Sequence, residues 1–218
     1  MTWKSQKNRS LRWLKNLSIH KFKNNMKKVG LFFGTFNPIH NGHLKVANYF
    51  VEKVELEEVW LVVSPQSPFK KIKSLIENTQ RLAMVNLALK DFPKLKVCDD
   101  EINLSKPSYT FNTLVHLKNK FPDYDFVLIL GQDILSCFHE WKNYEDILKN
   151  YNIYVYPRGQ SCLTPDEFKE HRNIHLFTAP EIEISSTEVR KMILKGEVPN
   201  NLVPKMVKNY IAINKLFL

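Results

Sequence analysis

The chain has 218 residues and a formal net charge of +10, with 44% hydrophobic and 25% charged residues. This composition indicates one globular domain with a sizeable core, and no apolar run approaches the roughly 18 residues of a membrane-spanning helix. The three scattered cysteines indicate neither a disulfide framework nor a thiolate metal site, so the reducing cytoplasm is the expected location.

The positive charge is concentrated at the N-terminus. Residues 1–25 hold seven Lys and Arg and no acid, so the rest of the chain carries only +3. We expect residues 1–25 to be a flexible basic extension or a stretch added by an early start codon, because Met26 stands just before the first apolar run. The domain at 26–218 is then nearly balanced in charge and does not require a nucleic-acid partner.

The first elements form a strand, a loop and a helix. Residues 29–33 are an apolar run typical of a buried strand, and apolar positions at helical spacing follow at 44–51. The loop between them reads Gly-Thr-Phe-Asn-Pro-Ile-His-Asn-Gly-His. A strand that enters a helix through such a loop predicts an anion site, because free backbone N–H groups and the helix dipole face the ligand.

Two histidines close this loop. His40 and His43 are three residues apart, so we expect them to share a face on the first helical turn. Two imidazoles placed there could donate hydrogen bonds to phosphate oxygens, as phosphoryl or nucleotidyl transfer requires. The alternative is a helix start with two exposed histidines and Gly42 in a tight turn.

The next segments predict a parallel sheet. Residues 58–63 form a β-branched apolar run, which completes a βαβ unit. The loop at 64–71 contains two prolines and Lys70, which either reaches phosphate or belongs to a solvated charge run. A helix is expected at 80–90, where Arg81 has a salt-bridge or a functional role, and a strand at 95–98. The acidic residues 99–101 should point in different directions, which disfavours a metal site.

The middle of the chain predicts a helix and a central strand. Ser108 or Thr110 can cap a helix that continues to residue 120. Residues 125–130 form a strand that ends at Gly131, where a ligand could approach the backbone. Asp133 then binds ribose hydroxyls or caps a helix, and Trp141 stacks on a ring or packs in the core.

The last segments predict two more strands, at 152–156 and 174–177, with a short helix at 166–171 between them; His175 is expected to be a packing residue. Ser185, Ser186 and Thr187 supply hydroxyl and N–H groups at a helix start. Arg190 lies one turn further, so this segment is either a phosphate clamp or an ordinary capped helix with a solvated arginine.

A final helix is expected at 204–216. The whole pattern predicts an α/β fold with a doubly wound, Rossmann-like parallel sheet.

Several of these strings resemble one family. Gly-Thr-Phe-Asn-Pro-Ile-His-Asn-Gly-His resembles the first signature of the His-x-Gly-His nucleotidyltransferase superfamily, and Ile-Ser-Ser-Thr-x-x-Arg resembles its second, about 140 residues later. Pro-Ser-Tyr-Thr-x-x-Thr-Leu and Gly-x-Asp-x-Leu-x-x-Phe-x-x-Trp are similar to strings of the bacterial nicotinate mononucleotide adenylyltransferases. The chain departs from that family at Phe69, which stands where the family has His in its Pro-Pro-His-Lys loop.

The resemblance implies an enzyme that joins AMP from ATP to nicotinate mononucleotide, giving nicotinate adenine dinucleotide and pyrophosphate in NAD synthesis. Mg²⁺ would arrive with ATP, with no metal held by the protein alone. The implied catalytic residues are His40, His43 and Arg190. The implied ATP-binding residues are Gly34, Thr35, Phe36, His40, His43, Gly131, Asp133, Ser185, Ser186 and Arg190. The implied mononucleotide-binding residues are Asn37, Lys70, Tyr109, Thr110 and Trp141.

Two alternatives remain open at this point. One is another enzyme of the superfamily, such as phosphopantetheine adenylyltransferase. The other is a non-catalytic nucleotide-binding module whose basic extension binds nucleic acid. The sequence also leaves open the choice between nicotinate and nicotinamide mononucleotide, and whether the chain forms a homo-oligomer.

Overall fold

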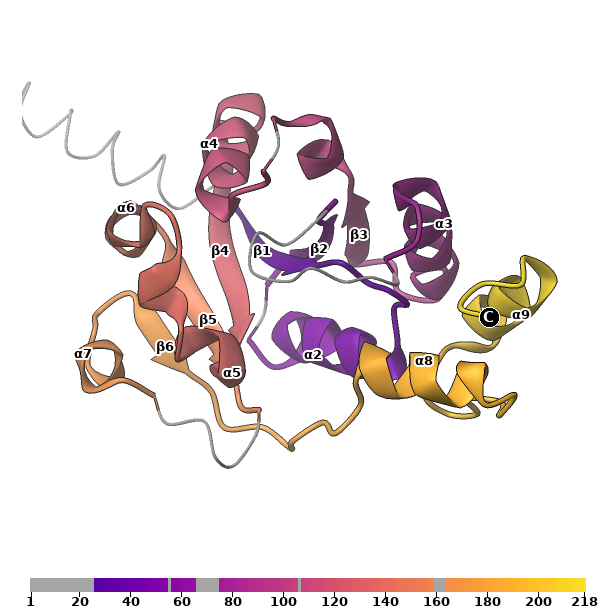
Figure 1. The fold of residues 1–218 in the computed structure, drawn as a ribbon. Helices are drawn as coiled ribbons and strands as arrows, with labels where there is room; N and C mark the ends of the chain where they lie inside the picture. The colour runs from indigo at the N-terminus through magenta and orange to yellow at the C-terminus, as the bar shows by residue number, and fades with distance from the viewer. Residues whose placement is uncertain (1–25, 55, 66–74, 106, 159–163) are drawn as a thin grey trace, which may run out of the picture.

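The computed structural model describes residues 26–54, 56–65, 75–105, 107–158 and 164–218. Within these residues, six strands form one sheet in the order β3-β2-β1-β4-β5-β6, and every neighbouring pair is parallel (Figure 1). The strands are β1 (Lys27–Gly34), β2 (Glu58–Val63), β3 (Leu95–Cys98), β4 (Tyr124–Gly131), β5 (Asn152–Tyr156) and β6 (Ile174–Leu176). This is the strand order of a doubly wound Rossmann sheet, which confirms the predicted fold class.

Helices connect the strands and cover both faces of the sheet (Figure 1). The helices are α2 (Asn41–Glu52), α3 (Asn78–Ala88), α4 (Thr110–Lys120), α5 (Gln132–Leu135), α6 (Tyr144–Asn150), α7 (Asp166–Lys169), α8 (Ser186–Leu194) and α9 (Lys205–Ile213). Two short 3₁₀ helices, η1 (Asp100–Asn103) and η2 (Phe138–Glu140), follow β3 and α5.

The core has two halves because successive side chains of a strand point to opposite faces of the sheet. In β4, Val127 and Ile129 join the half that packs against α2, α3, α8 and α9. Leu128 and Leu130 join the other half, which packs against α4, α6 and α7. Strands that are apolar on both faces are typical of a buried parallel sheet, so the near-continuous apolar runs of the sequence follow from this architecture.

Most predicted elements are confirmed, with small differences at their ends. The strands β2, β3 and β5 have the expected bounds. The capping prediction for α4 was wrong, because the residue before the helix is Tyr109 and no side chain caps it. The last helix is shorter than expected and begins directly after Pro204, whose ring fixes φ at a value that suits a helix start.

The strand order of the sheet reverses between β1 and β4, which is its topological switch point. From there β2 and β3 extend the sheet on one side, and β5 and β6 extend it on the other. The carboxyl end of β1 lies beside that of β2, with Gly34 opposite Val63. The carboxyl end of β4 lies beside that of β5, with Gly131 opposite Tyr156. In open α/β sheets, ligands bind in the crevice at this point, so the fold places Gly34 and Gly131 at the expected site.

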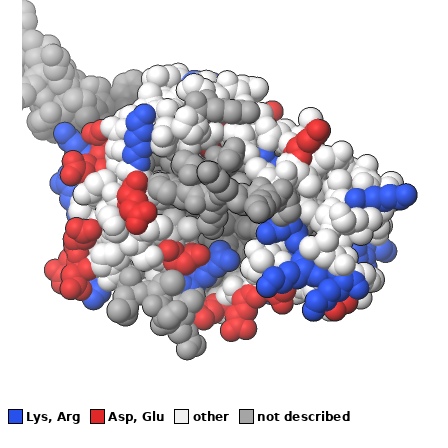
Figure 2. Space-filling model, viewed as in Figure 1, with Lys and Arg blue, Asp and Glu red and all other residues white. Residues whose placement is uncertain are grey.

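The described surface carries charged side chains of both signs. Figure 2 shows acidic side chains gathered over α6 and α7 and basic side chains over α8. Both signs on one face agree with the small net charge of residues 26–218 and single out no continuous basic surface on the face shown. None of the helices in the described ranges has the length and hydrophobicity needed to cross a membrane.

Candidate active site

The loop after β1 is held in a defined shape. Gly34 O accepts a 2.9 Å hydrogen bond from Ser64 N at the end of β2. Phe36 has a positive φ of 46° and a side chain that is only 1% exposed, so the chain turns sharply and inserts this ring into the core. The peptide bond between Asn37 and Pro38 is cis. The loop leads from the end of β1 to the start of α2 at Asn41.

The two histidines cap the start of α2 reciprocally. His40 is the N-cap residue, with extended backbone, and its Nδ1 accepts a 3.3 Å hydrogen bond from His43 N. His43 Nδ1 accepts a 3.2 Å hydrogen bond from His40 N. The two rings stack with centroids 3.6 Å apart. The expectation that both residues lie on the first helical turn was wrong for His40, which precedes the helix because its ring caps it.

Gly42 makes this stacking possible. A Cβ at this position would lie 2.9 Å from His40 Nδ1 and 3.0 Å from Ile182 Cγ2. Any larger residue would clash with the His40 ring in its present position. The Phe36 ring packs edge-on against His43 at 5.0 Å, so the imidazole pair is supported from the core side as well. Gly42 therefore serves the packing of the two rings rather than a tight turn with positive φ.

Burial keeps both imidazoles neutral. Loss of solvation lowers the pKa of His40 to about 3, with a smaller contribution from the charge of Arg158. The pKa of His43 is lowered well below its usual value, first by burial and then by His40 and Arg158. In each neutral ring Nδ1 accepts a hydrogen bond, so the proton resides on Nε2. Each ring thus has an Nε2–H group that can donate to a ligand.

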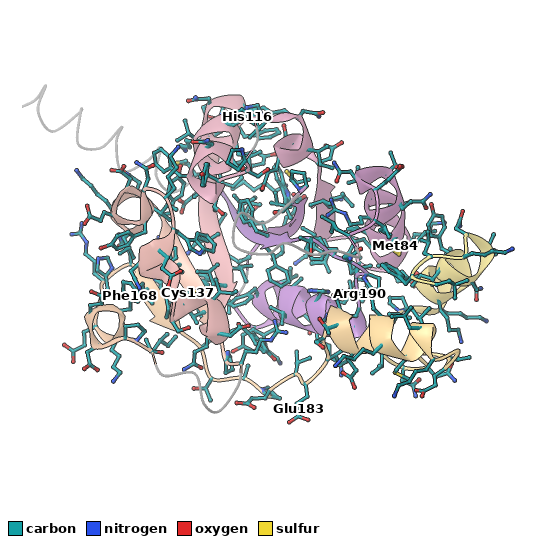
Figure 3. All side chains as sticks on the ribbon, viewed as in Figure 1. Met84, His116, Cys137, Phe168, Glu183 and Arg190 are labelled. Atoms are coloured by element: carbon teal, nitrogen blue, oxygen red, sulfur yellow. The ribbon has the colours of Figure 1, made fainter. Side chains whose placement is uncertain are left out.

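The start of α8 is bonded directly to the loop. Arg190 Nη1 donates a 2.7 Å hydrogen bond to Asn37 O, and Ser186 Oγ donates a 2.9 Å hydrogen bond to Pro38 O. Ser185 is the N-cap of α8 and accepts from Glu188 N at 3.1 Å. Figure 3 marks Arg190 where α8 passes alongside α2. Segments about 140 residues apart in sequence therefore form one site, which we call the loop site (residues 34–43 with Ser186 and Arg190).

A carboxylate and a guanidinium group lie at the end of β4 and β5. Asp133 Oδ2 is 3.8 Å from Arg158 Nε, and Asp133 Oδ1 is buried without a hydrogen-bond partner among the described residues. A Cβ on Gly131 would collide with Asp133 Oδ1, so the glycine lets this carboxylate fold back over the strand end. Arg158 also lines a cleft with His40, His43 and Ile182. Its charge therefore faces the histidine pair.

A second group of predicted residues lies around the start of α4. Tyr109 is the N-cap residue, and the Lys142 ammonium group lies 4.5 Å from the centre of its ring. Lys142 follows Trp141, whose half-buried ring packs against the buried Phe138 at 5.2 Å. The start of α4 and the Trp141 segment are therefore neighbours. We call Tyr109, Thr110 and Trp141 the α4 site.

The chain is similar to known proteins over most of its length. A family model described as cytidylyltransferase-like matches residues 31–192. A protein of Christiangramia forsetii is 51% identical over 185 residues, covering 85% of this chain and 95% of its own length. A protein of Flavobacterium psychrophilum is 50% identical over 184 residues, covering 84% and 95%. Both bear the name "Probable nicotinate-nucleotide adenylyltransferase". The chain belongs to the nicotinate-nucleotide adenylyltransferase family.

A solved structure of this family has the same fold. The Plasmodium falciparum nicotinic acid mononucleotide adenylyltransferase complexed with nicotinate adenine dinucleotide (NaAD) superimposes with a TM-score of 0.74. It is 22% identical in sequence, and the match covers 88% of this chain and 97% of that protein. The two proteins therefore share one fold although most of their residues differ.

The remaining predicted residues of the family site fall into three groups. Thr35 and Asn37 are held by hydrogen bonds from residues outside the loop site: Thr35 O accepts from Arg81, and Asn37 Oδ1 accepts from Ile76 N at 3.3 Å. Phe36 contacts His43 from the core, so its ring supports the site from behind. Lys70 lies outside the described residues.

Arg81 has a role that the sequence did not reveal. Its side chain is fully buried, and its guanidinium group donates to four backbone carbonyls: Thr35 O at 2.6 Å, Ser64 O at 2.7 Å, Pro65 O at 3.1 Å and Ile76 O at 3.2 Å. Burial lowers its pKa to about 10, so it stays charged at neutral pH. Arg81 joins the loops after β1 and β2 through carbonyl groups, and the described residues show no salt bridge for it. The predicted salt bridge was therefore wrong, and the structural role of Arg81 rests on backbone carbonyl groups instead.

Arg158 is the other residue that sequence reasoning missed. It follows Pro157 after β5, and in sequence it looks like an ordinary surface charge. Only the sheet order brings the end of β5 next to β4, and from there to the histidine pair. Its position at the carboxyl end of a strand is the one signal that could have pointed to it, because ligands bind at this edge.

Proposed function

We propose that this chain transfers AMP from ATP to nicotinate mononucleotide, releasing pyrophosphate and forming nicotinate adenine dinucleotide. The observation that carries the proposal is the bonding between the two signature segments, through Arg190 to Asn37 O and Ser186 to Pro38 O, beside the histidine pair. The names of its relatives support the choice of reaction. A module that only bound nucleotide would not need two neutral imidazoles fixed by each other's backbone.

The histidines would stabilise the transferring phosphate. Their Nε2–H groups would donate to non-bridging oxygens of the ATP α-phosphate, on which negative charge increases in the transition state. Reciprocal capping fixes both rings before the ligand binds, so little reorganisation is needed during the reaction. Because neither ring is charged at neutral pH, they contribute hydrogen bonds, and cations must come from elsewhere.

Arg190 and Arg158 are positioned to supply that charge. Arg190 uses Nη1 for Asn37 O and Nη2 for Thr187 Oγ1 at 3.2 Å, which orients the guanidinium group at the loop. Arg158 is 45% exposed at its side chain and lines the same cleft as the two histidines. A planar guanidinium group can bind two phosphate oxygens at once, so the two arginines would hold the triphosphate from both ends.

The chemical step would be a direct displacement. An oxygen of the mononucleotide phosphate forms a bond to the ATP α-phosphorus, the bond from that phosphorus to the bridging oxygen breaks, and pyrophosphate leaves. No covalent intermediate on the protein is required, since positioning and electrostatics suffice for such transfers. Asp133 would bind the ribose hydroxyls of ATP through its unpaired Oδ1.

Mg²⁺ would reach the site with ATP. Across the described ranges, no three His, Cys, Asp or Glu side chains come close enough together to hold a metal ion. The carboxylate of Asp133 faces Arg158 and offers a single acidic ligand. The residues present therefore fit an ion held by the ATP phosphates and water, where it would neutralise charge on the leaving pyrophosphate.

The α4 site would hold the mononucleotide ring. Backbone N–H groups at a helix start suit a ring carboxylate, and α4 has no side-chain cap to occupy them. Trp141 would stack on the pyridine ring. The free thiol of Cys98 is in keeping with the reducing cytoplasm, where we expect the reaction to take place.

The test is pyrophosphate release with ATP and Mg²⁺, measured with nicotinate mononucleotide, nicotinamide mononucleotide and phosphopantetheine in parallel. We expect rapid release with nicotinate mononucleotide. Release with phosphopantetheine alone would be consistent with the proposed role of the loop site but would contradict the proposed role of the α4 site. No release with any acceptor, from folded protein that binds ATP, would favour the non-catalytic module.

A further inference from the structure

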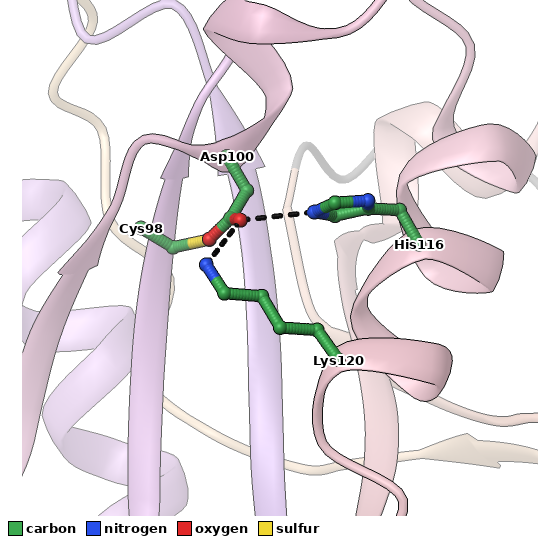
Figure 4. A network of polar contacts seen from close by, with 4 residues as sticks. All are labelled: Cys98, Asp100, His116 and Lys120. Atoms are coloured by element: carbon green, nitrogen blue, oxygen red, sulfur yellow. Dashed lines mark hydrogen bonds and ion pairs between the residues drawn. The ribbon is translucent and has the colours of Figure 1, made fainter.

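Two adjacent carboxylates in η1 have opposite surroundings. Asp100 lies toward α4, where its Oδ1 is 2.6 Å from Lys120 Nζ and 3.0 Å from His116 Nε2, with Cys98 Sγ 3.6 Å from its Oδ2 (Figure 4). Glu101 is the next residue, and it is only 3% exposed. The Lys120 ammonium group and the His116 ring are therefore both used by Asp100, whereas Glu101 is buried and has no ion pair among the described residues.

Glu101 lies among hydroxyl groups at the carboxyl edge of the sheet. The hydroxyls of Ser64, after β2, and Thr113, in α4, lie beside its carboxyl group. Its Oε2 and Thr113 Oγ1 are nevertheless buried without a hydrogen-bond partner among the described residues. Buried polar atoms normally have partners, so an unpaired carboxyl oxygen here requires an explanation.

The position of Glu101 links the two halves of the site. Ser64 N donates to Gly34 O at the start of the loop site. Thr113 N lies 3.4 Å from Tyr109 O, in the first turn of α4. Glu101 thus contacts the end of β2 on one side and the turn that begins the α4 site on the other.

The ionisation of Glu101 is set by burial. Loss of solvation raises its pKa to about 7, and the neighbouring hydroxyls lower it only partly. The charged and titratable groups around it are engaged elsewhere: Arg81 donates to the carbonyl of Ser64, and His116 and Lys120 of α4 contact Asp100. A second negative charge near a buried carboxylate is unfavourable, so a ring carboxylate at the start of α4 would favour the protonated form.

We propose that Glu101 is a positioning residue of the α4 site that takes up a proton from solvent when a mononucleotide with an anionic ring carboxylate binds. This rests on the proposed function for the identity of the ligand. Protonated Glu101 would hold the first turn of α4 against the end of β2 without repelling the ligand. A mononucleotide with a neutral amide in place of the carboxylate would not change the protonation of Glu101.

The first test is the pH dependence of binding. The dissociation constants of nicotinate and nicotinamide mononucleotide are measured by calorimetry on the full chain between pH 6.5 and 8.5. The dissociation constant of the nicotinate ligand is divided by that of the nicotinamide ligand. This ratio cancels the titration of the phosphate group that both ligands share. We expect the ratio to rise about tenfold toward high pH, which one pKa unit of interaction would give. In Glu101→Gln the ratio should be independent of pH, and in the exposed control Glu170→Gln it should follow the wild type.

Each outcome decides the proposal separately from the proposed function. A Glu101→Gln protein that keeps the wild-type rise would overturn it. If this variant does not fold, wild-type calorimetry at pH 8 in buffers of different ionisation heat replaces it: proton uptake with the nicotinate ligand alone supports the proposal, and equal uptake with both ligands overturns it. If nicotinate mononucleotide binds with this proton uptake but no pyrophosphate is released, the proposed reaction is contradicted. The proposed role of Glu101 in binding would still stand.

Discussion

The loop site and the α4 site differ in how their polar atoms are paired. In the loop site, His40 and His43 cap each other, and Arg190 and Ser186 bond to backbone carbonyls. Around the α4 site, the oxygens of Glu101, Ser108 and Thr113 are buried without partners in the described part of the chain. The first site is complete before any ligand binds, and the second leaves polar atoms unpaired.

This difference matches the chemistry that each site is proposed to perform. A transferring phosphate needs donors that do not reorganise during the reaction, and paired side chains provide such fixed donors. A site that distinguishes one acceptor from another gains more from unpaired polar groups, because a wrong ligand leaves them unsatisfied. We therefore expect changes in the loop site to lower kcat and changes in the α4 site to raise the KM of the acceptor.

The largest effect is expected for His43→Ala. This change removes one Nε2–H donor and also the acceptor that caps His40 N. Loss of a single donor of this kind lowers kcat by about 100-fold or more. Steady-state pyrophosphate release measures the effect, and His175→Ala on β6, an exposed histidine, serves as the control. Unchanged turnover in His43→Ala would contradict the proposed mechanism.

The second-largest effect is expected from acid, which should destabilise the folded protein through the loop site. The pKa of His40 is about 3 in the folded protein and about 6.5 in the unfolded chain, so between these values the unfolded state binds more protons. The stability contributed by neutral His40 is complete above pH 6.5 and is lost as the pH falls toward 3. At pH 5 the loss should be about 2 kcal/mol.

Urea unfolding at pH 7.5 and pH 5 measures this loss. His40→Asn is the matched variant, because asparagine can cap a helix but does not titrate in this range. We expect a smaller decrease in unfolding free energy for His40→Asn than for the wild type. An equal decrease in both proteins would show that other groups govern acid stability.

A smaller effect is expected for Arg158→Ala, which removes a cation that faces the histidine pair. We expect the KM for ATP to rise about tenfold, the cost of one charge-assisted hydrogen bond, with a smaller change in kcat. Arg158→Lys should recover part of the affinity. Arg172→Ala, an exposed arginine after α7, is the control. An equal effect in both alanine variants would remove Arg158 from the site.

The smallest effect is expected for Trp141→Ala. Stacking of an aromatic pair contributes about 0.5–1.5 kcal/mol, so the KM for nicotinate mononucleotide should rise by about fivefold while kcat stays close to wild type. Trp141→Phe should keep most of the affinity. A lower kcat with unchanged KM would place Trp141 with the loop site instead, and the contrast between the two sites would fail.

The sequence predicted the sheet well because its signals are local. Apolar runs at 58–63, 95–98 and 152–156 contain what is needed to recognise a buried strand, and the structure has β2, β3 and β5 at these positions. Helix ends were less accurate. His40 was placed inside α2, and Ser108 or Thr110 was expected to cap α4, because a cap depends on side-chain orientation that spacing does not fix.

By itself, the sequence determined the fold class and the two signature segments that meet in the loop site. The tertiary structure alone decided three other features: the neutral state of His40 and His43, the carbonyl contacts of Arg81, and the approach of Arg158 to the histidines. The reason is physical. Hydrophobic periodicity is encoded in neighbouring residues, whereas burial and charge proximity depend on which distant segments the sheet order brings together.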